Sequence, residues 1–394
     1  MDKHYNLAIL GGGCAGLSLA MQLAETGSEA GSSAPSTIVL EKNVHYKNDR
    51  TWCFWDAADP KLKNWVDHAW LNFEIKNGAK TFTKSCKKHP YLMLSAQTFY
   101  KRSLEKLKAN KHVLTILNNQ DVLEVTKTRN QTWQITTATG SFTADKIVDT
   151  RPNQQIKEDD SLLWQSFVGH EVETSQDTFD SNTFVLMDFD AKFNQGLGFV
   201  YVLPYSARSA LIEYTIFSDQ AFTANQINNY IQAALLKYLK DLDYKIVRTE
   251  YGRLPMGNQK MKKSSDPSYI YAGLYAGAAR PSSGYAFQRI QRWAKDCAHA
   301  LIHHQLLVAP KKDPWILARM DDLFLNVLKS NPKSSIQLFY MLFLNCKTDT
   351  VIRFLSDHAS RLDYLAIIAS MPKLLFLKEL PIYMFKRLLK HRYD

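Results

Sequence analysis

The chain has 394 residues, of which 45% are hydrophobic and 12% aromatic, and it carries a formal net charge of +11. This length is enough for two or three domains with a large core, and the composition excludes a disordered or fibrous protein. Five cysteines without a C-x-x-C spacing and eleven histidines without ligand spacing argue against disulfides and a metal site, and favour a reducing cytoplasm.

The N-terminus leads directly into an apolar strand at Tyr5, without the features of a signal peptide. No run of about 18 uncharged apolar residues is present, so the sequence predicts no transmembrane helix. The positive charge favours an anionic partner such as a phosphate group or an acidic membrane surface. Because no nucleic-acid-binding motif accompanies it, we expect no nucleic-acid partner.

The first elements predict a strand, a tight turn, a helix and a second strand. Between the first strand and the helix, the spacing G-x-G-x-x-G predicts a dinucleotide-binding turn, and the alternative is an ordinary tight turn. The turn consists of Gly11, Gly12, Gly13, Cys14, Ala15 and Gly16. Glycines allow the backbone to approach a pyrophosphate at the helix N-terminus. Glu41 ends the second strand, where a carboxylate suits the ribose hydroxyls.

The following region predicts a helix at 96–109 and then short strands at 112–117, 121–126, 131–137 and 146–152. This β-meander indicates an FAD-binding flavoprotein rather than a plain NAD dehydrogenase. Further on, 163–217 is rich in strands, and 222–240 predicts a helix. From about residue 284 the chain is mainly helical, with interruptions expected at Pro310, Pro314, Pro332, Pro372 and Pro381.

The predicted fold is α/β, with a Rossmann-like FAD-binding domain, a substrate-binding β-sheet domain and a C-terminal helical region. We assign 1–160 and 265–310 to the first, 161–264 to the second and 311–394 to the third. The last 24 residues contain six Lys or Arg against two acids and alternate apolar with basic residues. This pattern suits a membrane interface; the alternative is a helix that packs on the core with a solvated basic side.

A second glycine cluster, at 269–290, resembles the part of FAD monooxygenases that lies under the isoalloxazine. Gly273, Pro281 and Gly284 retain that pattern, so we expect them to contact the cofactor. Leu274 stands where those enzymes carry an aspartate for the ribityl chain. The flavin site is therefore expected to be present but modified.

The segment EKNVHYKNDRTWCFWD, at 41–56, resembles the one that follows the second strand in bacterial lycopene β-cyclases. The similarity continues in order through DTRP (149–152), FVGHEVET (167–174), LMDF (186–189), FVYVLPYSARSALIEYT (199–215), GRLPM (252–256), ARPSSGYAF (279–287) and RFLSD (353–357). These matches extend over nearly the whole chain.

The resemblance implies a flavin monooxygenase-like fold and a lycopene β-cyclase, a carotenoid-biosynthesis isomerase without net redox change. Such an enzyme converts the ψ-ends of lycopene into β-ionone rings, giving β-carotene via γ-carotene, and requires reduced FAD with NAD(P)H as electron donor. We then expect a cytoplasmic protein, peripheral on the inner face of the cell membrane, with other carotenoid-pathway enzymes as further partners. The alternative is an FAD/NAD(P)H-dependent hydroxylase or reductase that acts on another isoprenoid lipid.

Glu213 lies in the strand LIEYTIF (211–217), where it shares one face with Leu211, Thr215 and Phe217. Apolar surroundings favour the protonated form of a carboxyl group. The resemblance implies that Glu213 is the general acid/base, with the N–H of the flavin as the competing proton donor. It also implies that Glu250 is a further acid of the site, which either assists proton transfer or pairs with a base. The structural alternative pairs Glu213 with Arg208.

The remaining predicted site residues are one cofactor contact and five aromatic residues. Arg50 is a candidate contact for the phosphates of the cofactor. The candidates for the substrate channel are Trp52, Phe54, Trp55, Tyr201 and Tyr285. For Trp52, Phe54 and Trp55 the alternative is a place in the hydrophobic core. A carbocation in an apolar channel needs a nearby negative charge, which an anionic reduced flavin can supply.

Overall fold

The glycine-rich turn lies at the C-terminal end of an interior strand of a mostly parallel sheet. The computed structural model describes residues 3–29, 34–55, 60–108, 113–152, 162–257 and 263–393. In this part of the chain the first sheet has the order β8-β2-β1-β11-β10-β9, and β17 also pairs with β11. Its strands are β1 (Lys3–Leu10), β2 (Thr37–Leu40), β8 (Leu114–Leu117), β9 (Val122–Lys127), β10 (Trp133–Thr137), β11 (Gly140–Asp149) and β17 (Tyr269–Tyr271).

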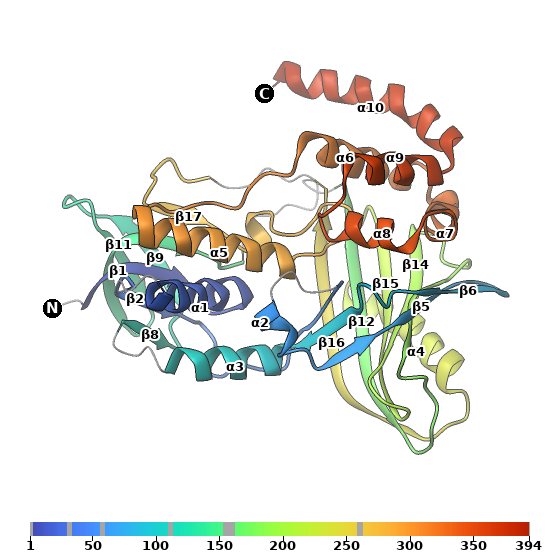
Figure 1. Cartoon of the computed structure of the whole chain (residues 1–394), viewed down its shortest axis with the longest axis horizontal. Coiled ribbons are helices and arrows are strands. Elements are labelled where there is room, and N and C mark those ends of the chain that lie inside the picture. Colours follow the sequence, from blue (N-terminus) through green and yellow to red (C-terminus); the bar gives the residue numbers. More distant parts are fainter. Residues whose placement is uncertain are drawn as a thin grey trace.

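The strand predicted at 112–117 is β8, and it pairs in parallel with β2 rather than with β9. The antiparallel meander therefore consists of β9, β10 and β11. The helices α1 (Cys14–Glu29), α3 (Ala96–Lys108) and α5 (Phe287–His304) pack together beside the sheet (Figure 1). Apolar residues of β1, β2 and β11 pack against α1 and α5 in one buried cluster, so α5 brings a late part of the chain next to the turn.

The second sheet forms the centre of the molecule. It has the order β16-β12-β15-β14-β13-β5-β6, and its strands are β5 (Asn72–Asn77), β6 (Lys80–Ser85), β12 (Leu163–Thr174), β13 (Thr183–Phe189), β14 (Leu197–Pro204), β15 (Ser209–Ser218) and β16 (Tyr244–Met256). The predicted segment 1–160 thus contains two strands, β5 and β6, that pair in this sheet. The boundary placed between residues 160 and 161 falls outside the described residues.

One face of the second sheet is covered by α4 (Ala224–Leu239), which packs apolar residues such as Ile227 and Ile231 against Ile212 and Ile216 (Figure 1). Thr223 caps this helix, and its hydroxyl accepts the amide of Gln226. A third, small sheet has the order β3 (Thr51–Trp55), β7 (Tyr91–Ser95) and β4 (His68–Trp70), and it contacts α5 through β3. The short helix α2 (Pro60–Lys63) lies between β3 and β4 in the chain. The opposite face of the second sheet is therefore left for other elements.

The C-terminal helices cover that opposite face, and α10 lies outermost (Figure 1). They are α6 (Trp315–Ser330), α7 (Ser335–Asn345), α8 (Thr348–Leu355), α9 (Arg361–Ser370) and α10 (Lys373–Tyr393), with short 3-10 turns η2 (Leu274–Ala276) and η3 (Pro332–Ser334). None of the helices in the described ranges has the length and apolar character needed to cross a bilayer.

Four of the five prolines lie between helices, as predicted, but the interruption expected at Pro381 is wrong. Pro381 lies inside α10. Proline removes one backbone N–H, which leaves the carbonyl of Leu377 without its helical partner. Leu377 and Pro381 are both exposed, so water can satisfy this carbonyl and the helix continues.

Candidate active site

The glycine-rich turn leaves open space in front of the N-terminus of α1. Gly11 has a φ of 98°, which favours glycine, and a Cβ on Gly16 would lie 2.0 Å from the carbonyl oxygen of Gly11. A Cβ on Gly13 would meet no atom within 4 Å. The backbone therefore packs tightly behind the turn and is open in front of it, as a pyrophosphate cradle requires.

Glu41 lies beside this turn, at the end of β2. Its Oε2 accepts the amide of Gly12 at 2.7 Å, and its Oε1 accepts two hydrogen bonds from Asn43, one from the backbone and one from the side chain, at 2.8 and 2.7 Å. A carboxylate has about four acceptor positions, so one remains for a further donor. The hydroxyl of Tyr46, next to Gly12, is buried and has no partner within the described ranges. Both groups are available to the ribose end of a dinucleotide.

The second glycine cluster comes together with the turn and with the second sheet. Gly273 has a φ of 82°, and its Cβ would lie 3.2 Å from Cβ of Ala15. The carbonyl of Pro281 accepts the amide of Gly257 at 3.1 Å. Gly284 has a φ of 73°, and its Cβ would lie 2.8 Å from Oε1 of Gln165. Residues from three distant parts of the sequence thus meet between the turn and the second sheet.

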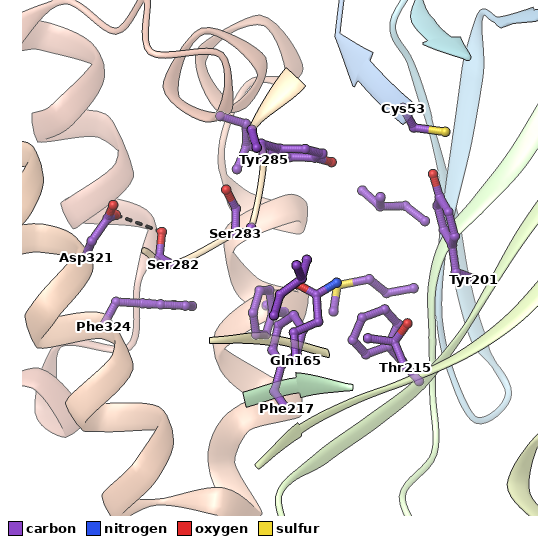
Figure 2. Close-up of a pocket in the computed structure, with 18 of the residues that line it drawn as sticks. Cys53, Gln165, Tyr201, Thr215, Phe217, Ser282, Ser283, Tyr285, Asp321 and Phe324 are labelled. Atoms are coloured by element: carbon purple, nitrogen blue, oxygen red, sulfur yellow. Dashed lines mark hydrogen bonds between the residues drawn. The ribbon is translucent and has the colours of Figure 1, made fainter. Parts of the chain in front are cut away.

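Two buried polar atoms at this junction lack partners in the described part of the chain: Oε1 of Gln165 and Oγ of Ser283. Both residues are adjacent to Gly284, and Figure 2 shows both side chains at the same cavity. A buried polar atom without a partner is unfavourable unless a ligand or water satisfies it. The junction therefore fits a planar ligand with hydrogen-bonding edges, such as the ring system of a flavin.

A cavity of about 890 Å³ continues from this junction across the second sheet. One wall comes from residues 282–287, the second from the open face of β12, β14 and β15, and the third from α6 to α10. Phe324 of α6 points toward the sheet in Figure 2. The lining is predominantly apolar and aromatic, so it suits a large hydrocarbon ligand. Arg50 lies at the margin of the cavity, exposed, and donates to the carbonyl of Asp49 at 2.8 Å.

Three of the predicted channel residues line the cavity: Trp52, Tyr201 and Tyr285. The hydroxyl of Tyr201 donates to that of Tyr91 at 3.0 Å, and the hydroxyls of Tyr91 and Tyr285 are 3.1 Å apart. Tyr201 and Tyr285 both point toward Cys53 (Figure 2). Burial raises the pKa of Tyr285 to about 12, and it raises the pKa of Tyr91 and Tyr201 well above the ordinary value of 10, so all three phenols stay neutral.

Phe54 and Trp55 are not among the residues that line the cavity, and their positions correspond to the alternative, a place in the hydrophobic core. Phe54 is buried in the core and stacks on Phe287 with ring centroids 4.9 Å apart. Trp55 is also buried and packs on Tyr91, with centroids 4.4 Å apart. Aromatic residues at the end of β3 serve the packing between α5 and the second sheet, and a sequence pattern does not separate this role from channel lining.

Glu213 faces the cavity, as the alternation of its strand predicts. Its face of β15 also carries Leu211, Thr215 and Phe217, which line the cavity, whereas the intervening residues pack toward α4. Glu213 is 9% exposed, and its Oε1 accepts the hydroxyl of Thr215 at 2.6 Å. Burial, and secondarily the charge of Glu250, raise the pKa of Glu213 from 4.5 to about 8. At neutral pH this carboxyl group holds a proton.

The structural alternative for Glu213 is not realised. Arg208 is exposed, and its Nε donates to Asp177 at 2.7 Å. Glu213 therefore faces the cavity without this guanidinium as a counter-charge.

Glu250 lies two strands away from Glu213, on the other side of β12. It is 8% exposed, and its Oε2 accepts from Nη1 of Arg248 at 2.7 Å and from Oγ1 of Thr51 at 3.0 Å. Burial raises the pKa of Glu250, and Arg248 opposes this effect. Gly169 of β12 is paired with Glu213 on one side and with Glu250 on the other. The two carboxyl groups thus face each other across a glycine.

Several residues of this site did not emerge from the sequence, namely Thr51, Arg248, Gly169, Gln165 and Tyr91. Weak signals exist: Arg248 and Glu250 are two residues apart on a strand and share a face, and a glycine in a strand interior often marks a close approach. Neither signal identifies the partner across the sheet.

Comparison with solved structures defines the fold class. A geranylgeranyl bacteriochlorophyll reductase-like protein from Thermoplasma acidophilum superposes with a TM-score of 0.62 at 13% identity, over 97% of this chain and 99% of that chain. A halogenase in complex with FAD superposes with a TM-score of 0.56 at 11% identity, over 95% of this chain and 85% of that chain. The predicted fold class is confirmed: an FAD-binding Rossmann-type domain with a second sheet and a helical C-terminus.

The chain belongs to the lycopene cyclase family, because residues 6–380 match the family described as lycopene cyclase protein. It is 24% identical over 343 residues to the chloroplastic lycopene beta cyclase of Nicotiana tabacum, which covers 80% of this chain. The match spans 65% of the length of that relative. The family is one of enzymes that act in carotenoid cyclisation.

Proposed function

We propose that the protein is a lycopene β-cyclase that forms β-ionone rings at the ψ-ends of lycopene, giving β-carotene via γ-carotene. The observation that carries this proposal is the pair of buried carboxyl groups, Glu213 and Glu250, at an apolar cavity that begins at the flavin-type junction. A hydrocarbon offers no polar anchor, so an apolar cavity can hold it and only an acid can initiate its reaction.

Cyclisation adds one proton to a terminal alkene and removes another after ring closure, so it consumes no electrons. Protonated Glu213 supplies the first proton, because its raised pKa keeps the proton available at neutral pH. The carboxylate of Glu250 accepts the proton that leaves the ring. Between these steps a carbocation exists in an apolar environment, where it is very costly without a negative charge nearby; the Glu250 carboxylate lies close enough to contribute.

FAD is the cofactor that the site fits best. The open turn at Gly13 and the acceptor position on Glu41 suit the nucleotide end of FAD, and the unpartnered atoms of Gln165 and Ser283 suit its ring end. The structural similarity to a halogenase in complex with FAD supports this assignment. When bound and reduced by NAD(P)H, FAD would supply a broad anionic surface next to the cavity. The residues Ser283 and Gln165 would hold its ring and orient it.

The test is anaerobic incubation of purified protein with lycopene and chemically reduced FAD. We expect β-rings to form without further consumption of reductant, and we expect Glu213→Gln to abolish ring formation while retaining flavin. Glu173→Gln is a matched control, because Glu173 lies on the same sheet but pairs with Lys245 at the surface. Full-rate cyclisation with oxidised flavin would contradict the proposal. NADPH oxidation in stoichiometric proportion to product would instead favour a hydroxylase or reductase of another isoprenoid lipid.

The substrate is a membrane-soluble hydrocarbon, so we further propose that the protein is peripheral on the cytoplasmic face of the membrane. Leu362 and Leu365 of α9 and Leu374 of α10 are exposed, and Ile368 and Leu377 are exposed and also line the cavity. Apolar side chains next to lysines on outermost helices suit the interface of an anionic bilayer.

The membrane proposal is tested by vesicle flotation. Liposomes that contain anionic lipid should bind the wild type, and Leu362→Glu with Leu374→Glu should reduce binding at least tenfold while cyclisation of detergent-solubilised lycopene persists. Equal binding of the double variant would exclude this face as the docking surface.

A further inference from the structure

We propose that Arg248 and Thr51 act as positioning residues that make the two carboxyl groups unequal, so that the pair holds one proton and this proton resides on Glu213. The proposal deepens the function above and rests on it for its meaning in catalysis. It assigns a role to two residues that no motif of the sequence indicated. It also explains how two acids in one environment can work as an acid and a base.

Arg248 is the centre of a hydrogen-bonded cluster on one side of the pair. Its Nη1 donates to Glu250 at 2.7 Å, its Nη2 to Oγ1 of Thr51 at 2.7 Å, and its Nε to Oε2 of Glu171 at 2.8 Å. Thr51 then donates its own hydroxyl proton to Glu250 at 3.0 Å. Both donors on Glu250 favour its ionised form, because each hydrogen bond is to a carboxylate oxygen.

The pairing of β16 with β12 places Arg248 in this cluster. Arg248 and Glu250 are two residues apart on β16, so their side chains share one face of the strand. Arg248 pairs with Glu171 in the same register that pairs Glu250 with Gly169. The register shifts only beyond this point, where Val172 pairs with Ile246 and Val247 is an extra residue. Regular pairing therefore extends over the whole cluster and holds the guanidinium on the side of Glu250.

Gly169 keeps the space between the two carboxyl side chains open. A Cβ on Gly169 would lie 3.2 Å from Cγ of Glu250 and 3.5 Å from Cβ of Glu213. Any side chain here would therefore separate the two acids. Because Gly169 itself places no side chain between them, the charge on Glu250 acts on Glu213 and favours its neutral form.

The other ionisable groups around the pair do not cancel this asymmetry. They come from the elements packed against it: Glu171 on β12, Arg50 before β3, Cys53 on β3, Tyr201 on β14 and Tyr205 at the end of that strand. Arg50 is a cation, but its side chain is 54% exposed, so solvent screens it, whereas that of Arg248 is 14% exposed. Glu213 has only the hydroxyl of Thr215 as a hydrogen-bond donor in the described chain. Among the described groups of this cluster, the cation that is hydrogen-bonded to the pair is therefore Arg248, which Glu250 shares with Glu171, and it lies on the side of Glu250.

The experiment compares the FAD-loaded wild type with Arg248→Met and Arg248→Lys across pH 5 to 9. Loss of the guanidinium raises the pKa of Glu250, so the acidic limb of the cyclisation profile should move upward by at least one pH unit in Arg248→Met. The ratio of rates at pH 6 and pH 8 should fall at least tenfold. Arg248→Lys retains the charge and should restore most of the ratio. Thr51→Val, which removes one hydrogen bond, should shift the limb less in the same direction.

A second readout does not depend on catalysis. Infrared difference spectra of the same holoproteins, with Glu213→Gln and Glu250→Gln as references, count protonated carboxyl groups by their C=O stretch. One protonated carboxyl at pH 7 in the wild type, assigned to Glu213, and two in Arg248→Met support the proposal. An equal count in both proteins, or a proton assigned to Glu250, overturns it, even when cyclisation is observed. If the infrared pattern is as expected but the protein does not cyclise lycopene, the proposed function is overturned and the present proposal is not.

Folding is controlled by the flavin-to-protein ratio and by unfolding midpoints of each variant. Glu173→Gln serves as the matched surface control and should leave both the pH profile and the infrared count unchanged. A uniform loss of rate at all pH values in Arg248→Met and Thr51→Val, with no shift of the acidic limb, would show that the cluster is merely structural and would also overturn the proposal.

Discussion

Replacing Glu213 with glutamine is expected to stabilise the folded protein while it removes the activity. The folded-state pKa of about 8 lies above the ordinary value of 4.5, so the folded state retains a proton that the unfolded chain releases. Stability conferred by this group is therefore fully present below pH 4.5, is lost as the pH rises toward 8, and changes little beyond. Glutamine does not ionise, so the variant escapes the loss.

The magnitude follows from the pKa difference. The interval from 4.5 to 8 corresponds to about 5 kcal/mol of unfolding free energy when each pKa unit contributes 1.36 kcal/mol. Compared with its value below pH 4.5, the unfolding free energy of the wild type should fall by about 2 kcal/mol at pH 6 and by nearly the full amount at pH 9, whereas that of Glu213→Gln lacks this contribution to the pH dependence. The amide can keep the hydrogen bond from Thr215 through its carbonyl oxygen. The pH dependence of the difference, more than its absolute size, carries the argument.

The assay is urea unfolding of the FAD-loaded wild type and Glu213→Gln at pH 6, 7, 8 and 9. Glu173→Gln removes one partner of an exposed ion pair at 2.7 Å from Lys245, and its effect should be within about 0.5 kcal/mol at every pH. The difference between wild type and Glu213→Gln should widen with pH. If the two unfolding curves shift in parallel from pH 6 to 9, Glu213 is ionised in the folded state, and the acid role fails.

Two further predictions concern the glycine-rich turn and the buried ion pair between Arg280 and Asp321 of α6. Gly16→Ala should lower the flavin-to-protein absorbance ratio severalfold, because its Cβ would meet the carbonyl of Gly11 at 2.0 Å; Gly140→Ala, with no atom within 4 Å, should retain flavin. Asp321→Asn should lower the unfolding free energy by about 3 kcal/mol, because the fully buried Arg280 loses its carboxylate partner at 3.0 Å and keeps the more distant Asp357 at 3.9 Å. An unfolding midpoint close to that of the wild type would refute this.

The parts of the site that the sequence predicted have local signals. The turn from Gly11 to Gly16 is one strand–turn–helix unit, and Glu41 ends the next strand. The period-2 pattern of β15 places Glu213 on a defined face without any knowledge of the sheet. For each of these residues the relevant geometry is set within one or two adjacent elements, which is the range at which sequence patterns are informative.

The parts that the sequence did not predict depend on register across the sheet. Thr51 and Glu250 are 199 residues apart in sequence, yet Oγ1 of Thr51 lies 3.0 Å from Oε2 of Glu250 in the fold. Gly169 lies between two strands that pair with β12 on opposite sides, and the register of β16 against β12 places Arg248 opposite Glu171. A one-residue change of register reverses the face of every side chain, and no local pattern specifies which strands become neighbours. Tyr91 is absent from the predicted site for the same reason.

Two of the three walls of the cavity have different roles. The sheet wall carries the acid pair, and its geometry is fixed by strand pairing and by Gly169. The helical wall contributes mainly apolar side chains and is joined to the flavin-type loop through Arg280 and Asp321. The two acids lie on the sheet wall, whereas the helical wall contributes apolar lining residues. Substitutions in α6 to α10 should therefore change which hydrocarbon binds and leave the pKa values of the two acids unchanged. Phe324 of α6, which points across the cavity in Figure 2, is therefore the position at which a smaller side chain should alter substrate length or the number of ends cyclised, while the pH profile stays that of the wild type.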